Sequence, residues 1–131
     1  MRTRVLVAED VEVLRETLVA LLELEGDLEV VAELASGDRI VPEALERRPD
    51  VALLDIDLPG TDGLTAAADL RGRLPTCRVL ILTGLATAGA RSRASAVGAS
   101  GFLVKAGTAD DLIDAVRRAA RGERLFAGRP G

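Results

Sequence analysis

Short apolar runs alternate five times with segments of helical periodicity along the chain. The runs typical of β-strands cover residues 4–8, 28–32, 51–54, 78–82 and 101–104. The two that begin at Val51 and Arg78 are almost continuously apolar, as parallel strands buried on both faces should be. Five strand–helix units with short connections predict a doubly wound α/β fold, a five-stranded parallel sheet with helices on both faces.

The helical segments between the strands cover residues 11–25, 37–47, 64–74, 87–97 and 109–121. The first is predicted to bury one apolar face made of Val11, Leu14, Leu18, Leu21 and Leu22. Gly26 and the pair Arg48-Pro49 are expected to end the first and second helices. Thr108 is the expected N-cap of the fifth helix, because it precedes two acidic residues in the first turn.

Composition limits the functions available to this chain. Hydrophobic residues make up 48% of the 131 residues and charged residues 29%, a balance typical of one globular domain. We expect a cytoplasmic protein with no membrane partner, because it has one cysteine, no signal peptide and no apolar stretch of roughly 20 residues. The net charge of −4 argues against nucleic-acid binding by this domain itself. The absence of histidine excludes Ser-His-Asp catalysis and imidazole zinc sites.

Polar residues follow four of the five predicted strands, where open parallel sheets build their binding sites. The first strand is followed by Glu9 and Asp10, the third by Asp55, the fourth by Thr83 and the fifth by Lys105. Three carboxylates at one edge repel one another unless a cation lies among them, and carboxylate oxygens are the ligands that Mg²⁺ prefers. The sequence therefore predicts an acidic Mg²⁺ site at the carboxyl edge of the sheet.

Lys105 is the single lysine among seventeen basic residues. An ammonium is a compact point charge, which suits one anionic oxygen better than the planar guanidinium does. Each candidate also has an ordinary explanation, such as a solvated acid at a helix start, β-propensity for Thr83, or coding bias against lysine. Because all of these residues agree on one edge, we favour a site in which Asp55 accepts a phosphoryl group. Lys105 then balances its charge and Thr83 binds one of its oxygens.

With these motifs the chain resembles the receiver domain of bacterial two-component response regulators. The resemblance covers about residues 4–124 and rests on Glu9-Asp10, on residues 54–63, on Leu82-Thr83 and on residues 102–105. It implies a flavodoxin-like sheet of order 2-1-3-4-5 and a phosphorylation-activated domain that a sensor histidine kinase phosphorylates. The implied roles are phosphoacceptor for Asp55, Mg²⁺ binding by Glu9, Asp10, Asp55 and the backbone carbonyl of Asp57, phosphoryl contacts from Thr83 and Lys105, and a switch aromatic at Phe102.

Residues 102–107 and 117–124 look most like the NarL/FixJ subfamily. That resemblance implies a receiver over residues 1–124, the start of a linker over residues 125–131, and a helix-turn-helix DNA-binding domain beyond it that controls transcription. It also implies a homodimer formed on phosphorylation through the first and fifth helices, since an output domain would pair to bind a two-fold DNA site. Val19 supports this dimer, because we expect it on the solvent-facing side of the first helix. Such a domain phosphorylates and dephosphorylates itself but is not a turnover enzyme.

Three positions depart from the commoner receiver pattern. Glu9 replaces an aspartate and has one more methylene, so a water is expected to bridge its carboxylate to the metal. Leu58 replaces a usual methionine, which the packing should tolerate. Ala106 replaces a proline that many receivers hold in a cis bond, and a cis Lys105–Ala106 bond would cost about 2.5–4 kcal/mol.

Two alternatives remain open from the sequence. Phosphatases resembling the haloacid dehalogenase superfamily also end an apolar strand in Asp-x-Asp, with Asp55 as nucleophile and Asp57 as general acid in this chain. The acids already present at residues 9 and 10, and the lack of room for a cap domain, weigh against this reading. The second alternative is a pseudo-receiver that binds partners without phosphorylation.

Overall fold

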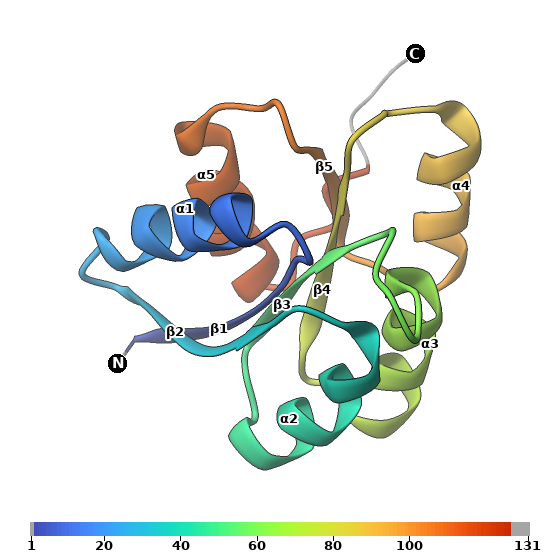
Figure 1. Ribbon diagram of the computed structural model, residues 1–131, viewed down its shortest axis with the longest axis horizontal. Coiled ribbons are helices and arrows are strands. Elements are labelled where there is room, and N and C mark those ends of the chain that lie inside the picture. The colour runs from blue at the N-terminus through green and yellow to red at the C-terminus, as the bar shows by residue number, and fades with distance from the viewer. Residues whose placement is uncertain (1, 127–131) are drawn as a thin grey trace.

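The computed structural model describes residues 2–126, and its five strands form one parallel sheet (Figure 1). The strands are β1 (Thr3–Ala8), β2 (Leu28–Leu34), β3 (Val51–Asp55), β4 (Arg78–Thr83) and β5 (Gly101–Val104). Their order in the sheet is β2-β1-β3-β4-β5, and every neighbouring pair is parallel. The predicted fold class and strand order are confirmed.

Helices cover both faces of the sheet. They are α1 (Glu12–Glu23), α2 (Ile40–Arg47), α3 (Gly63–Arg73), α4 (Ala88–Ala96) and α5 (Ala109–Ala120), and a 3₁₀ turn, η1 (Gly37–Arg39), precedes α2. Figure 1 shows α1 and α5 together on one side, and α2, α3 and α4 on the other. Because β5 lies at one end of the strand order, its outer edge has no neighbouring strand in the described sheet.

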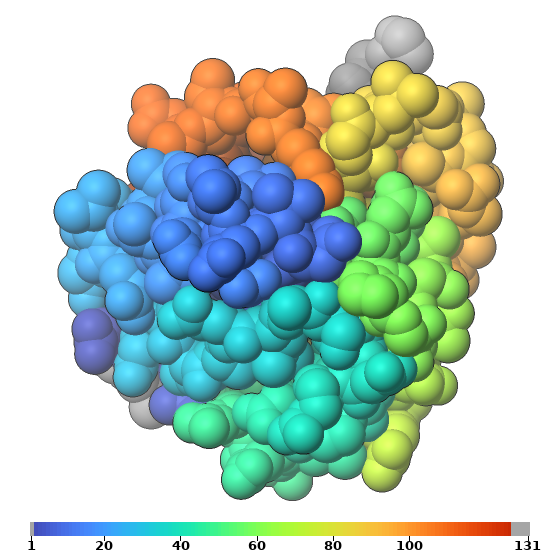
Figure 2. Space-filling model, in the orientation of Figure 1, coloured from blue at the N-terminus to red at the C-terminus, as the bar shows by residue number. Residues whose placement is uncertain are grey.

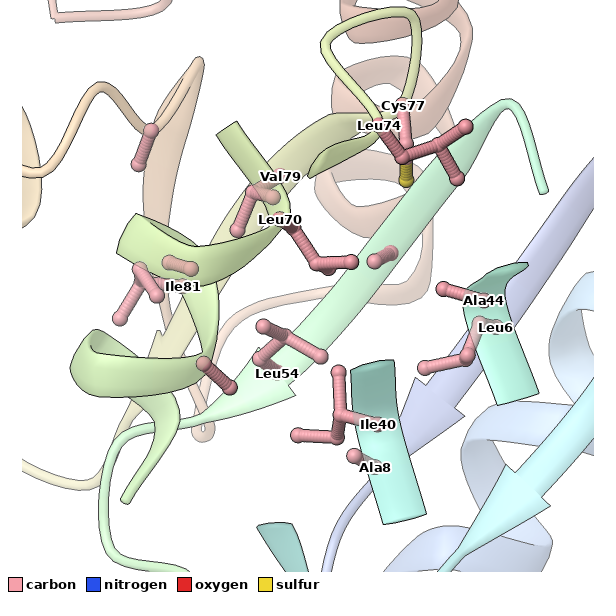
Figure 3. Close-up of a cluster of buried hydrophobic side chains, with 14 of the residues drawn as sticks. Leu6, Ala8, Ile40, Ala44, Leu54, Leu70, Leu74, Cys77, Val79 and Ile81 are labelled. Atoms are coloured by element: carbon pink, nitrogen blue, oxygen red, sulfur yellow. The ribbon is translucent and has the colours of Figure 1, made fainter. Parts of the chain in front are cut away.

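Two apolar layers hold the helices to the sheet. On the side of α2, α3 and α4, Leu6, Leu54 and Ile81 of the strands pack with Ile40 and Leu70 of the helices (Figure 3). On the other side, the alternate strand residues Val5, Leu53 and Leu80 pack with Leu18 of α1 and Val116 of α5. Successive strand residues point to opposite faces, so burial on both faces requires the continuous apolar runs seen in the sequence.

Several predicted helix details are confirmed. The hydroxyl of Thr108 accepts a hydrogen bond from the backbone N–H of Asp111 at 3.0 Å and caps α5 as expected. Helix α2 ends where predicted: its last residue is Arg47, and the next residue, Arg48, takes a left-handed conformation with φ of 50°. The predicted second helix divides into η1 and α2, and Pro42 lies in the first turn of α2, where its missing N–H costs little.

Three expectations about the first helix are wrong. Val11 does not share the buried face, because it is the extended residue before α1 and its side chain is 51% exposed. Val19 is not on the solvent-facing side: it is partly buried and packs against the core layer that joins α1 and α5 to the sheet. The helix stops at Glu23, so Gly26 lies beyond its end and is not its cap.

The chain does not leave the domain directly after α5. The N–H of Leu125 donates to the carbonyl of Ser100 at 2.6 Å, and Leu125 packs against Gly101 at the start of β5. Phe126 packs against the core layer of α2, α3 and α4. The linker predicted for residues 125–131 lies, from residue 127 on, outside the described residues. Within residues 2–126 no helix combines the length and apolar character needed to cross a membrane.

Candidate functional site

The carboxyl ends of the strands bring the predicted acidic residues together. Carboxylate oxygens of Glu9, Asp10 and Asp55 all lie within 4.8 Å of one another. Glu9 and Asp55 are 0% and 1% exposed, whereas Asp10 is open to solvent. Figure 2 shows the start of α1, the segment after β3 and the segment after β5 meeting on the visible face. The edge therefore carries a compact, half-open acidic site, as predicted.

Lys105 reaches this site from the end of β5. Its Nζ lies 2.9 Å from Glu9 Oε1 and 2.9 Å from Asp55 Oδ2, and its side chain is 23% exposed. Burial alone would lower the pKa of Lys105, but hydrogen bonds to Asp55 and Glu9 outweigh burial and raise it. The ammonium is thus held charged between two buried carboxylates.

Glu9 is the most deeply buried member of the site. Burial raises its pKa, because the hydrogen bonds from the Val11 N–H and from Lys105 offset the loss of water only in part. Oε2 accepts the Val11 N–H at 2.9 Å. Oε1 is buried and lies 2.9 Å from Lys105 Nζ, which is its charged partner. Three clustered carboxylates that share a single ammonium fit a hard divalent cation such as Mg²⁺.

The loop after β3 shapes the surroundings of Asp55. The N–H of Asp57 donates to Asp55 Oδ1 at 3.1 Å, and this local hydrogen bond orients the Asp55 carboxylate. The side chain of Asp57 is exposed and is not among the three clustered acids. Gly63 begins α3 directly against β3: a Cβ there would lie 2.1 Å from the carbonyl oxygen of Asp55. This contact requires glycine.

A support for that loop was missed by the sequence reasoning. Asp38 Oδ1 accepts the N–H of Thr61 at 3.0 Å and its hydroxyl at 3.2 Å, and the Gly37 N–H donates to the carbonyl of Pro59 at 3.0 Å. Gly60 takes a φ of +77° beside the Asp38 carboxylate, a conformation that favours glycine. These contacts join residues 22 or 23 positions apart, so local periodicity carries no signal for them.

Thr83 ends β4 near the acids, but its hydroxyl is turned toward its own loop. It donates to the carbonyl of Leu85 at 3.1 Å and accepts the Leu85 N–H at 3.3 Å. Thr83 is 4% exposed, and Phe102 is partly buried on the neighbouring strand. The structure therefore brings Glu9, Asp10, Asp55 and Lys105 into direct proximity, and it leaves the hydroxyl of Thr83 engaged elsewhere.

Leu58 and Ala106, which also depart from the commoner receiver pattern, are accommodated without distortion of the fold. Leu58 is 7% exposed and packs in the core layer of α2, α3 and α4. The Lys105–Ala106 bond is trans, as are the other peptide bonds of the described chain. The N–H of Lys105 donates to the carbonyl of Thr83 at 2.8 Å, which holds the segment in register without a proline.

Comparison with known proteins identifies the class to which this fold and site belong. The family model of the response regulator receiver domain matches residues 5–117. The chain therefore belongs to the receiver domain family of two-component response regulators, and the resemblance read from its motifs is confirmed. The phosphatase alternative is not supported.

Particular relatives narrow the class to regulators of the NarL/LuxR type. The transcriptional regulatory proteins YvfU and DesR of Bacillus subtilis are 38% and 37% identical over 124 and 123 residues. These matches cover 95% and 94% of this chain but 62% and 61% of the relatives, so the chain spans about three fifths of their length. The receiver domain of the response regulator NarL from Mycobacterium tuberculosis superposes with a TM-score of 0.90 at 35% identity, covering 93% of this chain and 98% of that one.

Proposed function

We propose that this domain accepts a phosphoryl group on Asp55 and uses it to switch the activity of a transcriptional regulator. The arrangement that carries the proposal is the lysine bridge: one ammonium lies 2.9 Å from each of two buried carboxylates, beside a third exposed one. A structural ion pair needs one acid for one base. The surplus of negative charge at the end of β3 is better explained by a cation and a transferred phosphoryl group.

The residues fit Mg²⁺ as the resident cation. Glu9, Asp10, Asp55 and the backbone carbonyl of Asp57 would hold it, with water completing its shell. When bound, Mg²⁺ supplies positive charge to the oxygens of the transferred group. The unbalanced charge supports this assignment, because three carboxylates whose oxygens lie within 4.8 Å of one another face a single ammonium.

The chain's own residues perform the transfer. An Asp55 oxygen forms a bond to phosphorus as the bond from phosphorus to the nitrogen of a phosphohistidine, or to the oxygen of a small acyl phosphate, breaks. Lys105, already beside Asp55 Oδ2, counters the charge that develops on the phosphoryl oxygens. The hydroxyl of Thr83 then turns from Leu85 to one of those oxygens. Because the resulting adduct is a stored signal, the domain is not a turnover enzyme.

The partners follow from this role. We propose a sensor histidine kinase as phosphoryl donor, a homodimer through α1 and α5 on phosphorylation, DNA contact only through a separate domain, and a cytoplasmic location.

Val19 does not support the dimer, because it is partly buried. Val13 and Leu24 do, because these apolar residues of α1 and its end are 74% and 79% exposed. Sedimentation with and without beryllofluoride and Mg²⁺ tests the dimer: an unchanged mass at high protein concentration would reject it.

The transfer itself is tested with acetyl phosphate as donor. A phosphoryl adduct should form in Mg²⁺ and be lost in EDTA, and p-nitrophenyl phosphate should not be turned over. Failure to form any adduct in Mg²⁺ would favour a pseudo-receiver. Multiple turnover of the ester would contradict the signalling role.

A further inference from the structure

The last described residue, Phe126, lies against the aromatic residue of β5. The ring centroids of Phe126 and Phe102 are 6.5 Å apart and the rings are tilted by 38°. The guanidinium carbons of Arg91 and Arg124 each lie 5.6 Å from the Phe126 ring centroid. Arg91 also donates to the carbonyl of Phe126 at 2.9 Å. Phe126, which lies beyond the last helix, is thus contacted by Phe102 of β5, by Arg91 of α4 and by Arg124.

Phe102 of β5 and Arg91 of α4, which both contact Phe126, are each linked to Thr83. Ile81 pairs with Phe102 and Thr83 with Val104, so Thr83 and Phe102 face the same side of the sheet. The second link runs through the loop before α4, because the Thr83 hydroxyl makes two hydrogen bonds to the backbone of Leu85. That loop leads into α4, where Arg91 lies near the first turn. A turn of Thr83 toward Asp55 would break both bonds and free this loop.

We propose that Phe126 is a latch, docked when Asp55 is unmodified and released when Asp55 is phosphorylated. This proposal rests on the proposed function of Asp55. The receiver reaction itself uses neither Phe126 nor Arg91. Docking would hold Phe102 and the loop before α4 in the arrangement that keeps Thr83 on Leu85. Phosphorylation of Asp55 would thereby change how the segment after α5 is held against the domain.

Reciprocity gives the latch a measurable effect at the site. If phosphorylation weakens docking by some factor, docking weakens binding of the phosphoryl group by the same factor. An aromatic pair or a cation–π contact changes an equilibrium by about two- to tenfold. Loss of the latch should therefore tighten the binding of a phosphoryl mimic by about that factor, although Phe126 is remote from the acids.

Calorimetric titration with beryllofluoride in Mg²⁺ tests this directly. We expect Phe126→Ala and Arg91→Ala to bind the mimic about two- to tenfold more tightly than the wild type. Phe126→Tyr, which keeps the ring, should bind like the wild type. Arg93→Ala is the matched control, because it removes the same charge from an exposed position on the same helix. Its affinity should not change.

The two phenylalanines of the chain give a second readout, since no tyrosine or tryptophan is present. Fluorophenylalanine labelling should give two ¹⁹F resonances, for Phe102 and Phe126, and both should shift when beryllofluoride binds. A Phe126 resonance that stays fixed while Phe102 moves would overturn the latch, as would equal affinities in all variants. Absence of mimic binding by the wild type would instead overturn the proposed function, and the latch with it.

Discussion

Removing the ammonium of Lys105 is expected to lower the free energy of unfolding, because the acidic site then has no counter-charge of its own. Lys105→Met keeps most of the side-chain length but leaves Glu9 and Asp55, 0% and 1% exposed, without the cation 2.9 Å away. Breaking a buried ion pair by deleting one partner costs about 3–5 kcal/mol of unfolding free energy. Because Lys105 is itself 23% exposed and solvent already screens it, we expect about 3 kcal/mol, the lower end.

Urea unfolding followed by far-ultraviolet circular dichroism, in EDTA at neutral pH, measures this loss. The matched control is Arg39→Met, which removes a 64% exposed partner of Glu43 while Arg47 stays 3.4 Å from the same carboxylate, and it should cost less than about 1 kcal/mol. Adding Mg²⁺ should restore part of the stability of Lys105→Met, since a ligand at 100 times its Kd stabilises by about 2.7 kcal/mol. If Lys105→Met unfolds in EDTA at the same urea concentration as the control variant, the lysine bridge does not neutralise the acids.

Three further changes test separate parts of the account. Lys105→Arg should unfold near the wild-type midpoint yet impair phosphorylation-dependent dimerisation measured by sedimentation; normal switching would show that a compact cation is not needed. Gly63→Ala should destabilise by more than about 1 kcal/mol through its clash with the Asp55 carbonyl, whereas Gly72→Ala on the same helix, in open space, should stabilise by about 0.4–1 kcal/mol in urea unfolding. Asp62→Ala removes the N-cap of α3 and should cost about 1 kcal/mol at neutral pH. The Thr65 N–H holds the pKa of Asp62 below its usual 3.8, so this contribution is present above that pH and is lost as the pH falls through the lowered pKa; an unfolding difference that persists in acid would contradict it.

The fold and the direct members of the site could be predicted because their signals are local in the sequence. Strand periodicity located all five strands, and parallel strands place their carboxyl ends at one edge, so Asp55 and Lys105 had to meet although they are 50 residues apart. Periodicity failed for Val11 and Val19, because it fixes neither the start of a helix nor the width of its buried face.

Contacts made by irregular segments could not be predicted. Asp38 supports the loop after β3 from 23 residues away, and Phe126 returns to β5 after the amphipathic pattern has ended. The direction of the Thr83 hydroxyl, which bonds to the backbone of Leu85, is likewise not decided by residue type alone. Neither periodicity nor residue type gives a signal for these contacts, because each depends on how an irregular segment lies on the folded domain.

Intact-protein mass spectrometry after incubation with acetyl phosphate and Mg²⁺ tests the central assignment most directly. The wild type should gain the mass of one phosphoryl group, and Asp55→Asn should gain none while remaining folded by circular dichroism. An adduct of equal abundance on Asp55→Asn would show that Asp55 is not the phosphoacceptor.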